Sequence, residues 1–173
     1  MMHFEAAHAR RGWQRACAKH IFLEPGDYFV GDQDCVVRTL LGSCVSIVLW
    51  HPQRRLGAMS HFLLGAQSGA GAGRSAGMYA DQVMEAMARE LALAGAAVDE
   101  CIAKIFGGGD MFPAYRVPDC PHAGHKNGAA ARALLSERGV AVVAEDLFGV
   151  GYRDVIFDLA SGDVWVCHTG EML

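Results

Sequence analysis

The sequence predicts an α+β fold with one or more mixed β-sheets and two main helices. Three observations carry this prediction: short β-branched runs recur along the chain, two longer segments have helical patterns, and a hairpin signal ends the sequence. Strands that come in runs, with helices between the runs, are typical of this class. With 173 residues, of which 52% are hydrophobic, the chain is long enough for one domain with a real core.

The strands are expected where β-branched and other apolar residues gather between turn signals. These runs are residues 28–30, 36–41, 45–50, 58–64, 102–106, 140–144, 155–159 and 164–167. A polar turn at residues 51–57 is placed to fold the third run back on the fourth. The segment at residues 160–163, Ala-Ser-Gly-Asp, predicts the hairpin between the last two.

Two segments have helical patterns. In the first, Tyr79 to Leu93, apolar residues share one face, and Gly95 stands in the usual position for a helix stop. The second runs from about Gly128 to Arg138 and is stopped by Gly139. Residues 65–77 hold five glycines among thirteen residues, which is typical of a loop that is either a simple connector or a lid.

The expected domain organisation is an N-terminal arm at residues 1–22, either flexible or in contact with a partner, and a single domain at residues 23–173. A net charge of −4 gives no indication of a nucleic-acid partner or an anionic membrane. The longest apolar run has roughly half the length of a membrane span, so no insertion into a membrane is expected. The N-terminus lacks a signal-peptide pattern, and we therefore expect a cytoplasmic protein.

Six cysteines are present, but no C-x-x-C pair indicates a redox dithiol or a zinc ribbon. A reducing cytoplasm favours free thiols over disulfides. The segment Cys120-Pro121-His122-Ala123-Gly124-His125, next to Asp119, is either a metal-responsive loop or a polar surface loop, and we expect no metal or cofactor. The glycines at 107–109 lack the Gly-Lys-Ser/Thr of a phosphate loop and favour a tight turn.

The strongest functional signal is Gly42-Ser43-Cys44, followed seventeen residues later by His61. Glycine permits a sharp turn, serine leaves the thiol uncrowded, and backbone N–H groups there could form an oxyanion hole. A neighbouring imidazole is the usual general base for a cysteine nucleophile, and Thr39 could orient that ring through its hydroxyl. The residues alone leave open that Cys44 is a buried structural thiol and His61 a satisfied core histidine.

Five segments, in order along the chain, resemble the CheD family of bacterial chemotaxis proteins. They are residues 41–45, 57–64, 79–81, 103–112 and 144–149, and the match runs from about Tyr28 to the C-terminus. The resemblance implies a layered α/β sandwich similar to that of bacterial toxin-type cysteine deamidases. It also implies a protein-glutamine deamidase that converts chemoreceptor glutamines to glutamates in chemotaxis adaptation, with Cys44 as nucleophile, His61 as base and Thr39 completing the triad.

The resemblance leaves other readings open. Some members carry the triad threonine one residue further from the cysteine, where this chain has Arg38, so the register is open. The region from Pro113 to Lys126 is longer than usual, and Ala131 stands where an asparagine is common. The alternative function is a non-catalytic module that binds chemoreceptors or a CheC-type phosphatase, which the resemblance implies as a partner for the active-site face.

Overall fold

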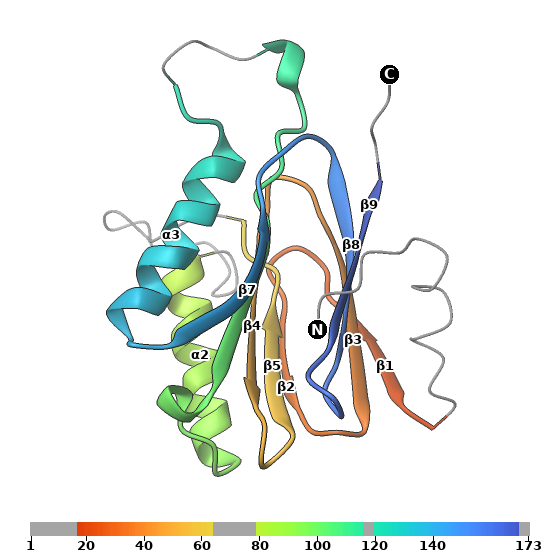
Figure 1. The fold of residues 1–173 in the computed structure, drawn as a ribbon, viewed down its shortest axis with the longest axis vertical. Helices are drawn as coiled ribbons and strands as arrows, with labels where there is room; N and C mark the ends of the chain where they lie inside the picture. The colour runs from red at the N-terminus through yellow and green to blue at the C-terminus, as the bar shows by residue number, and fades with distance from the viewer. Residues whose placement is uncertain (1–16, 64–78, 116–119, 170–173) are drawn as a thin grey trace.

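The computed structural model describes residues 17–63, 79–115 and 120–169. Within them, one sheet has the strand order β1-β3-β8-β9, a second has the order β2-β5-β4-β6-β7, and two helices cover the outer face of the second sheet (Figure 1). The α+β class with mixed sheets and two main helices is therefore confirmed. The elements are β1 (Lys19–Phe22), β2 (Tyr28–Gly31), β3 (Cys35–Leu41), β4 (Val45–His51), β5 (Leu56–Ser60), α2 (Ala80–Leu93), η1 (Val98–Glu100), β6 (Ile102–Gly107), η2 (Pro113–Tyr115), α3 (Ala123–Glu137), β7 (Ala141–Leu147), β8 (Tyr152–Asp158) and β9 (Val164–Thr169).

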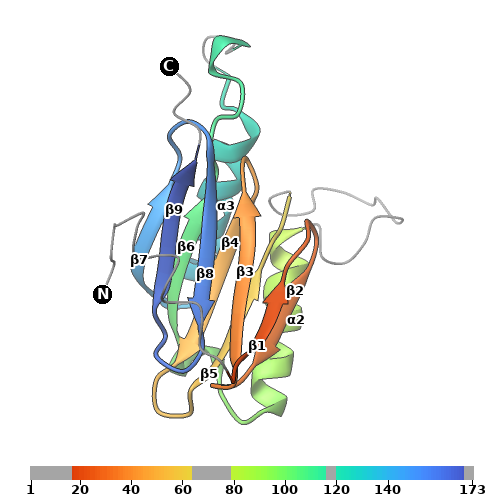
Figure 2. The same ribbon diagram turned by 90° about the vertical axis from the view of Figure 1, so that its right-hand side faces the viewer.

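Both sheets are mixed. Figure 1 shows them edge-on as two layers, and in Figure 2 the four-stranded sheet lies in front of the five-stranded sheet. In the four-stranded sheet β1 runs parallel to β3, while β3, β8 and β9 are antiparallel. In the five-stranded sheet β2, β5, β4 and β6 are antiparallel, and β7 runs parallel to β6. The predicted turn between β4 and β5 and the hairpin between β8 and β9 are both confirmed.

Two hydrophobic cores separate the three layers. The first lies between the helices and the five-stranded sheet, and the second lies between the two sheets. The residues of β4 alternate between them: Ile47 and Leu49 face the helices, whereas Val48 and Trp50 face the four-stranded sheet. This alternation fixes the side of the sheet on which each polar residue of β4 lies.

Three elements differ from the sequence prediction. β5 ends at Ser60, so His61 lies just beyond the strand in which it was expected. α3 begins at Ala123, five residues earlier than predicted. The last four residues of the expected arm, 19–22, form β1, which pairs with β3. The glycine-rich segment at residues 65–77 lies outside the described residues.

All six cysteines lie in the described parts of the chain, and each is a free thiol. None of the helices in those parts is both long and apolar enough to cross a membrane.

Candidate active site

The residues from Gly42 to Cys44 carry the chain from one sheet to the other. β3 belongs to the four-stranded sheet and β4 to the five-stranded sheet, so this short turn spans the gap between the two layers. Cys44 is half-buried and packs against the core between the sheets. The nucleophile candidate is therefore held at one end of the sandwich by both layers.

Each carbonyl of this turn accepts a hydrogen bond. Gly109 N–H donates to Gly42 O (2.8 Å), Gly108 N–H donates to Cys44 O (2.8 Å), and Asn127 Nδ2 donates to Ser43 O (3.0 Å). A trans peptide directs its N–H opposite to its C=O. The N–H groups of Ser43 and Cys44 therefore point away from these donors, and neither donates to a backbone acceptor within the described residues.

His61 is fixed by its own backbone. Its N–H donates to Asp27 O (2.8 Å), and its C=O accepts from Gly26 N–H (2.7 Å). Immediately after it, Phe62 exchanges both backbone hydrogen bonds with Val45, at 3.1 and 3.0 Å. The loop before β2 and the start of β4 together hold the imidazole in one place.

Strand register brings Cys44 and His61 to the same face. Val45 and Phe62 are opposite each other and both pack in the core beside the helices. Their neighbours Cys44 and His61 must therefore face the four-stranded sheet. In this register the two are diagonal cross-strand neighbours, and such a spacing is within reach of an aromatic side chain like the imidazole.

Thr39 meets the imidazole from the opposite sheet. Its Oγ1 lies 2.7 Å from His61 Nδ1 and 2.8 Å from Leu23 O, and both Thr39 and His61 are buried. A carbonyl can only accept, so the single hydroxyl proton is donated to Leu23 O. The hydroxyl must then accept from His61 Nδ1–H, which leaves Nε2 with its lone pair free to take a proton.

Of the two positions considered for the threonine, Thr39 is the one whose side chain reaches His61. Arg38, the other position considered, faces the outer side of the sheet and makes two hydrogen bonds to Asp154. Thr39 alone of the two faces the gap between the sheets.

Burial acts on the charges of both reacting groups. Desolvation raises the pKa of the Cys44 thiol, and the backbone N–H of the same residue opposes this only in part. Desolvation is also the largest effect on His61, whose pKa it lowers, while the Leu23 carbonyl and the Asp27 carboxylate act in the other direction. Both shifts favour a neutral thiol beside a neutral imidazole in the free protein.

Asn127 is a site residue that the sequence reasoning missed. Its side chain is buried, and Nδ2 donates to Ser43 O and to Leu63 O (2.8 Å), the carbonyls beside Cys44 and beyond His61. The sequence analysis noted the lack of an asparagine at position 131. Ala131 lies in the core between the helices and the sheet, and Asn127, about one helical turn earlier, ties the two parts of the site together.

The glycines after β6 must approach the turn closely. A Cβ on Gly107 would lie 2.3 Å from Cys44 O, and one on Gly124 of α3 would lie 2.4 Å from Gly108 O. The predicted tight turn bordering the site is therefore present. It is packed between Cys44 on one side and the first turn of α3 on the other.

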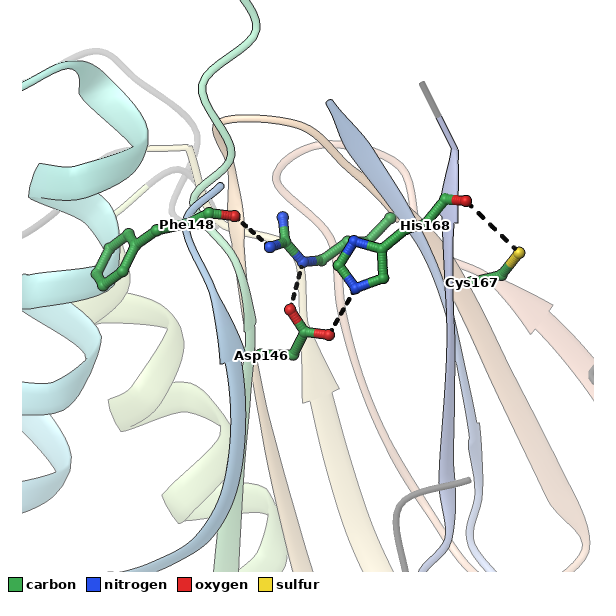
Figure 3. A network of polar contacts seen from close by, with 5 residues as sticks. Asp146, Phe148, Cys167 and His168 are labelled. Carbon is green, nitrogen blue, oxygen red and sulfur yellow. Dashed lines mark hydrogen bonds and ion pairs between the residues drawn. The ribbon is translucent and has the colours of Figure 1, made fainter. Parts of the chain in front are cut away.

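A largely buried ion pair supports the loop after β7, and Figure 3 shows Asp146 with its polar contacts. Arg153 Nε donates to Asp146 Oδ1 (2.8 Å), and Nη2 donates to the carbonyl of Phe148. Asp146 Oδ2 also lies 2.8 Å from His168 Nε2. Phe148 N–H in turn donates to Gly107 O (2.9 Å), so Arg153 fixes the loop after β7 against the turn that contacts Cys44.

The candidate metal loop has other roles in the structure. His122 is the N-cap of α3 and accepts from His125 N–H (3.3 Å), while the ring of His125 stacks on Phe148. No group of three metal-ligating side chains occurs among the described residues, which do not include Asp119. Cys120 and His122 instead line a pocket that also borders Ser43, with the exposed Phe112 on its wall.

A half-buried thiol, an imidazole with its Nε2 free and a hydroxyl that orients the ring are typical of the class of cysteine–histidine hydrolase sites. Comparison with known proteins narrows this class. Residues 63–168, more than half of the chain, match the family model CheD, described as CheD chemotactic sensory transduction. The chain belongs to the CheD family.

Several curated relatives match over most of their length. The chain is 47% identical to the "Probable chemoreceptor glutamine deamidase CheD 2" of Albidiferax ferrireducens, over 84% of each chain. It is 42% identical to the "Probable chemoreceptor glutamine deamidase CheD" of Pseudomonas savastanoi pv. phaseolicola, over 86% of this chain and 84% of the relative. For "Probable chemoreceptor glutamine deamidase CheD 1" of Chromobacterium violaceum the identity is 38%, over 87% of this chain and 78% of the relative.

Proposed function

We propose that this protein is a protein-glutamine deamidase that converts glutamines of chemoreceptors to glutamates in chemotaxis adaptation. The observation that carries the proposal is the 2.7 Å contact between Thr39 Oγ1 and His61 Nδ1, because it leaves Nε2 free on the face that Cys44 shares. Family membership supplies the substrate class, since the curated relatives are named for chemoreceptor glutamine. We further propose that it works in the cytoplasm.

In the first half of the reaction, Cys44 is the nucleophile and His61 the general base. Both groups are neutral at rest, so the thiol proton passes to Nε2 as sulfur attacks the side-chain amide carbon. The tetrahedral intermediate then collapses with cleavage of the C–N bond. His61 returns the proton to the leaving nitrogen, ammonia departs, and a thioester remains on Cys44.

The N–H groups of Ser43 and Cys44 form the oxyanion hole in this proposal. Their carbonyl partners are held by Gly109 and Asn127, so both donors are oriented before substrate arrives. In the second half, His61 takes a proton from water, and the resulting hydroxide attacks the thioester. The C–S bond breaks, the thiol regains its proton, and the receptor carries a glutamate. No step calls for a metal or cofactor.

The test is mass spectrometry of a chemoreceptor co-expressed with the wild-type protein or with Cys44→Ala. We expect the small mass gain of Gln-to-Glu conversion with the wild type and a loss of at least about a thousandfold in rate with the variant. Unchanged conversion by Cys44→Ala would show that Cys44 is not the nucleophile.

The second candidate is a binding module for chemoreceptors or for a CheC-type phosphatase. The pocket beside Ser43 favours it, because Met111, Phe112 and Tyr115 line this pocket and expose apolar side chains one residue away from Cys44 in the chain. Pull-down with wild type and Cys44→Ala separates the two functions. Equal binding by both proteins, with no deamidation by either, would favour the binding module, whereas deamidation that only Cys44→Ala loses supports the enzyme.

A further inference from the structure

Ser46 lies directly across from His61. The register that pairs Val48 with Met59 and Val45 with Phe62 places Ser46 opposite His61. Because Val45 and Phe62 exchange both backbone bonds, the next pair is of the non-hydrogen-bonded type, in which side chains stand closest. Ser46 and Cys44 are two residues apart and therefore share the face toward the four-stranded sheet.

The hydroxyl of Ser46 is buried and has no partner among the described residues. Ser46 is 0% exposed, and its Oγ makes no hydrogen bond. Buried polar atoms without partners are rare, and those that persist often serve a catalytic or binding role. Strand propensity alone does not account for a bare hydroxyl at this position.

Ser60 is the natural comparison. It is also 0% exposed and lies next to His61 in the chain, but its Oγ accepts from Ile47 N–H (3.0 Å) and donates to Ile47 O (3.3 Å). Its hydroxyl thus replaces backbone pairing between β4 and β5 and has a structural role. The hydroxyl of Ser46 has no such use, although it is on the face of the reacting groups.

We propose that Ser46 is a further polar residue of the active site, whose hydroxyl stabilises the charged imidazolium of His61 when Cys44 gives up its proton. This proposal rests on the function proposed above. A hydroxyl can rotate to present its lone pairs to the positive ring. It acts only while His61 carries charge, so it lowers the barrier to thiolate formation without helping the resting state.

The other groups around His61 offset its burial only in part. Thr39 is neutral and already accepts from Nδ1, and Cys44 is the proton donor itself. The Leu23 carbonyl raises the pKa of the ring, and so does Asp27, the charged side chain that acts on His61 within the described residues. Burial lowers that pKa more strongly than these groups raise it. An additional oxygen beside the ring would raise the pKa of His61 and so oppose the effect of burial.

The test measures the rate of Cys44 alkylation by iodoacetamide against pH, alongside deamidation of a chemoreceptor. For Ser46→Ala we expect the midpoint of the alkylation profile to rise by about one pH unit and kcat to fall about tenfold, because a change of one pKa unit in the stability of the charged ring corresponds to a factor of ten. KM should not change, because Ser46 is fully buried beneath the site. Ser60→Ala is the control: its melting temperature should fall while its alkylation midpoint stays at the wild-type value.

A second pair of variants separates the hydroxyl from packing. Ser46→Thr and Ser46→Val add nearly the same volume, but only threonine keeps the hydroxyl. A lower midpoint for Ser46→Thr than for Ser46→Val supports the proposal, and equal midpoints for the pair overturn it, as does a wild-type profile for Ser46→Ala. Alkylation needs no receptor, so an absence of deamidation by the wild type would count against the proposed function while the alkylation profiles still decide the role of Ser46.

Discussion

Removal of the Thr39 hydroxyl is the most direct test of the hydrogen-bond chain across the sandwich. Thr39→Val keeps the volume and β-branching of the side chain, so it should create no cavity. It leaves Leu23 O and His61 Nδ1–H without their shared partner in a region where Thr39 is 0% and His61 3% exposed. Any effect of the change can therefore be assigned to the loss of the Thr39 hydroxyl.

The expected loss of stability comes from those two groups. A buried polar group left without a partner costs about 1–3 kcal/mol, so the free energy of unfolding should fall by about 2–6 kcal/mol. For a chain of this length that corresponds to a fall in melting temperature of about 4–24 °C. The imidazole also loses its fixed tautomer. We expect kcat to fall on the order of a hundredfold, less than the roughly ten-thousandfold loss when a charged orienting carboxylate is neutralised.

The assay compares ammonia release and Cys44 alkylation at a temperature where every variant is folded. Thr39→Ser keeps the hydroxyl and should retain most of the activity. Arg38→Met changes the neighbouring residue, which faces the other side of β3, and should also remain active. Wild-type turnover by Thr39→Val, or a larger loss for Arg38→Met than for Thr39→Val, would refute the assignment.

Two further predictions concern stability. Arg153→Met should lower the free energy of unfolding by about 3–5 kcal/mol, because it leaves the carboxylate of Asp146 without its buried partner. Arg132→Met removes the exposed pair with Glu145 and should lower the free energy of unfolding by no more than about 1 kcal/mol. Urea denaturation measures both losses, and equal losses would contradict the structural role assigned to Arg153. Burial lowers the pKa of His61, so below the ordinary histidine pKa of about 6.5 the unfolded chain binds more protons than the folded chain. The contribution of His61 to the free energy of unfolding is therefore fully present above that pH and is lost as the pH falls through and below it. His61→Asn should therefore lose less stability than the wild type between about pH 6.5 and 5 in denaturation series, and an identical decline would show that His61 does not contribute to it.

Local sequence patterns predicted the elements that depend on local chemistry. Strands β3 and β4 are rich in β-branched residues, and the glycine-serine turn between them indicates a sharp connection, so the position of Cys44 could be predicted. His61 was assigned to the correct region but to the wrong element. β5 stops at Ser60 because the backbone of Gly26 and Asp27 takes over the N–H and C=O of His61, a long-range contact with no local signal.

The residues that complete the site were harder to predict for the same reason. Asn127 contacts Ser43 from 84 positions away, and nothing in its neighbourhood marks it as different from other helix residues. The start of α3 was placed too late because Gly124 is a poor helix former. The structure requires glycine there, since the helix packs directly against the carbonyl of Gly108. Strand β1 was missed because it has only four residues, of which the first two are polar.

The hydrogen bond between Thr39 and His61 joins two different sheets, since Thr39 belongs to β3 and His61 follows β5. This hydrogen bond therefore holds the two sheets together as well as forming part of the candidate active site. A small shear between the two sheets would break this hydrogen bond, while the pairing of strands within each sheet and the turn that carries Cys44 stayed intact. Heat or pressure should therefore release His61 from Thr39, and so lower activity, before either sheet unfolds. A partner that binds between the two sheets at this end could break the Thr39–His61 hydrogen bond and inhibit the protein without contacting Cys44.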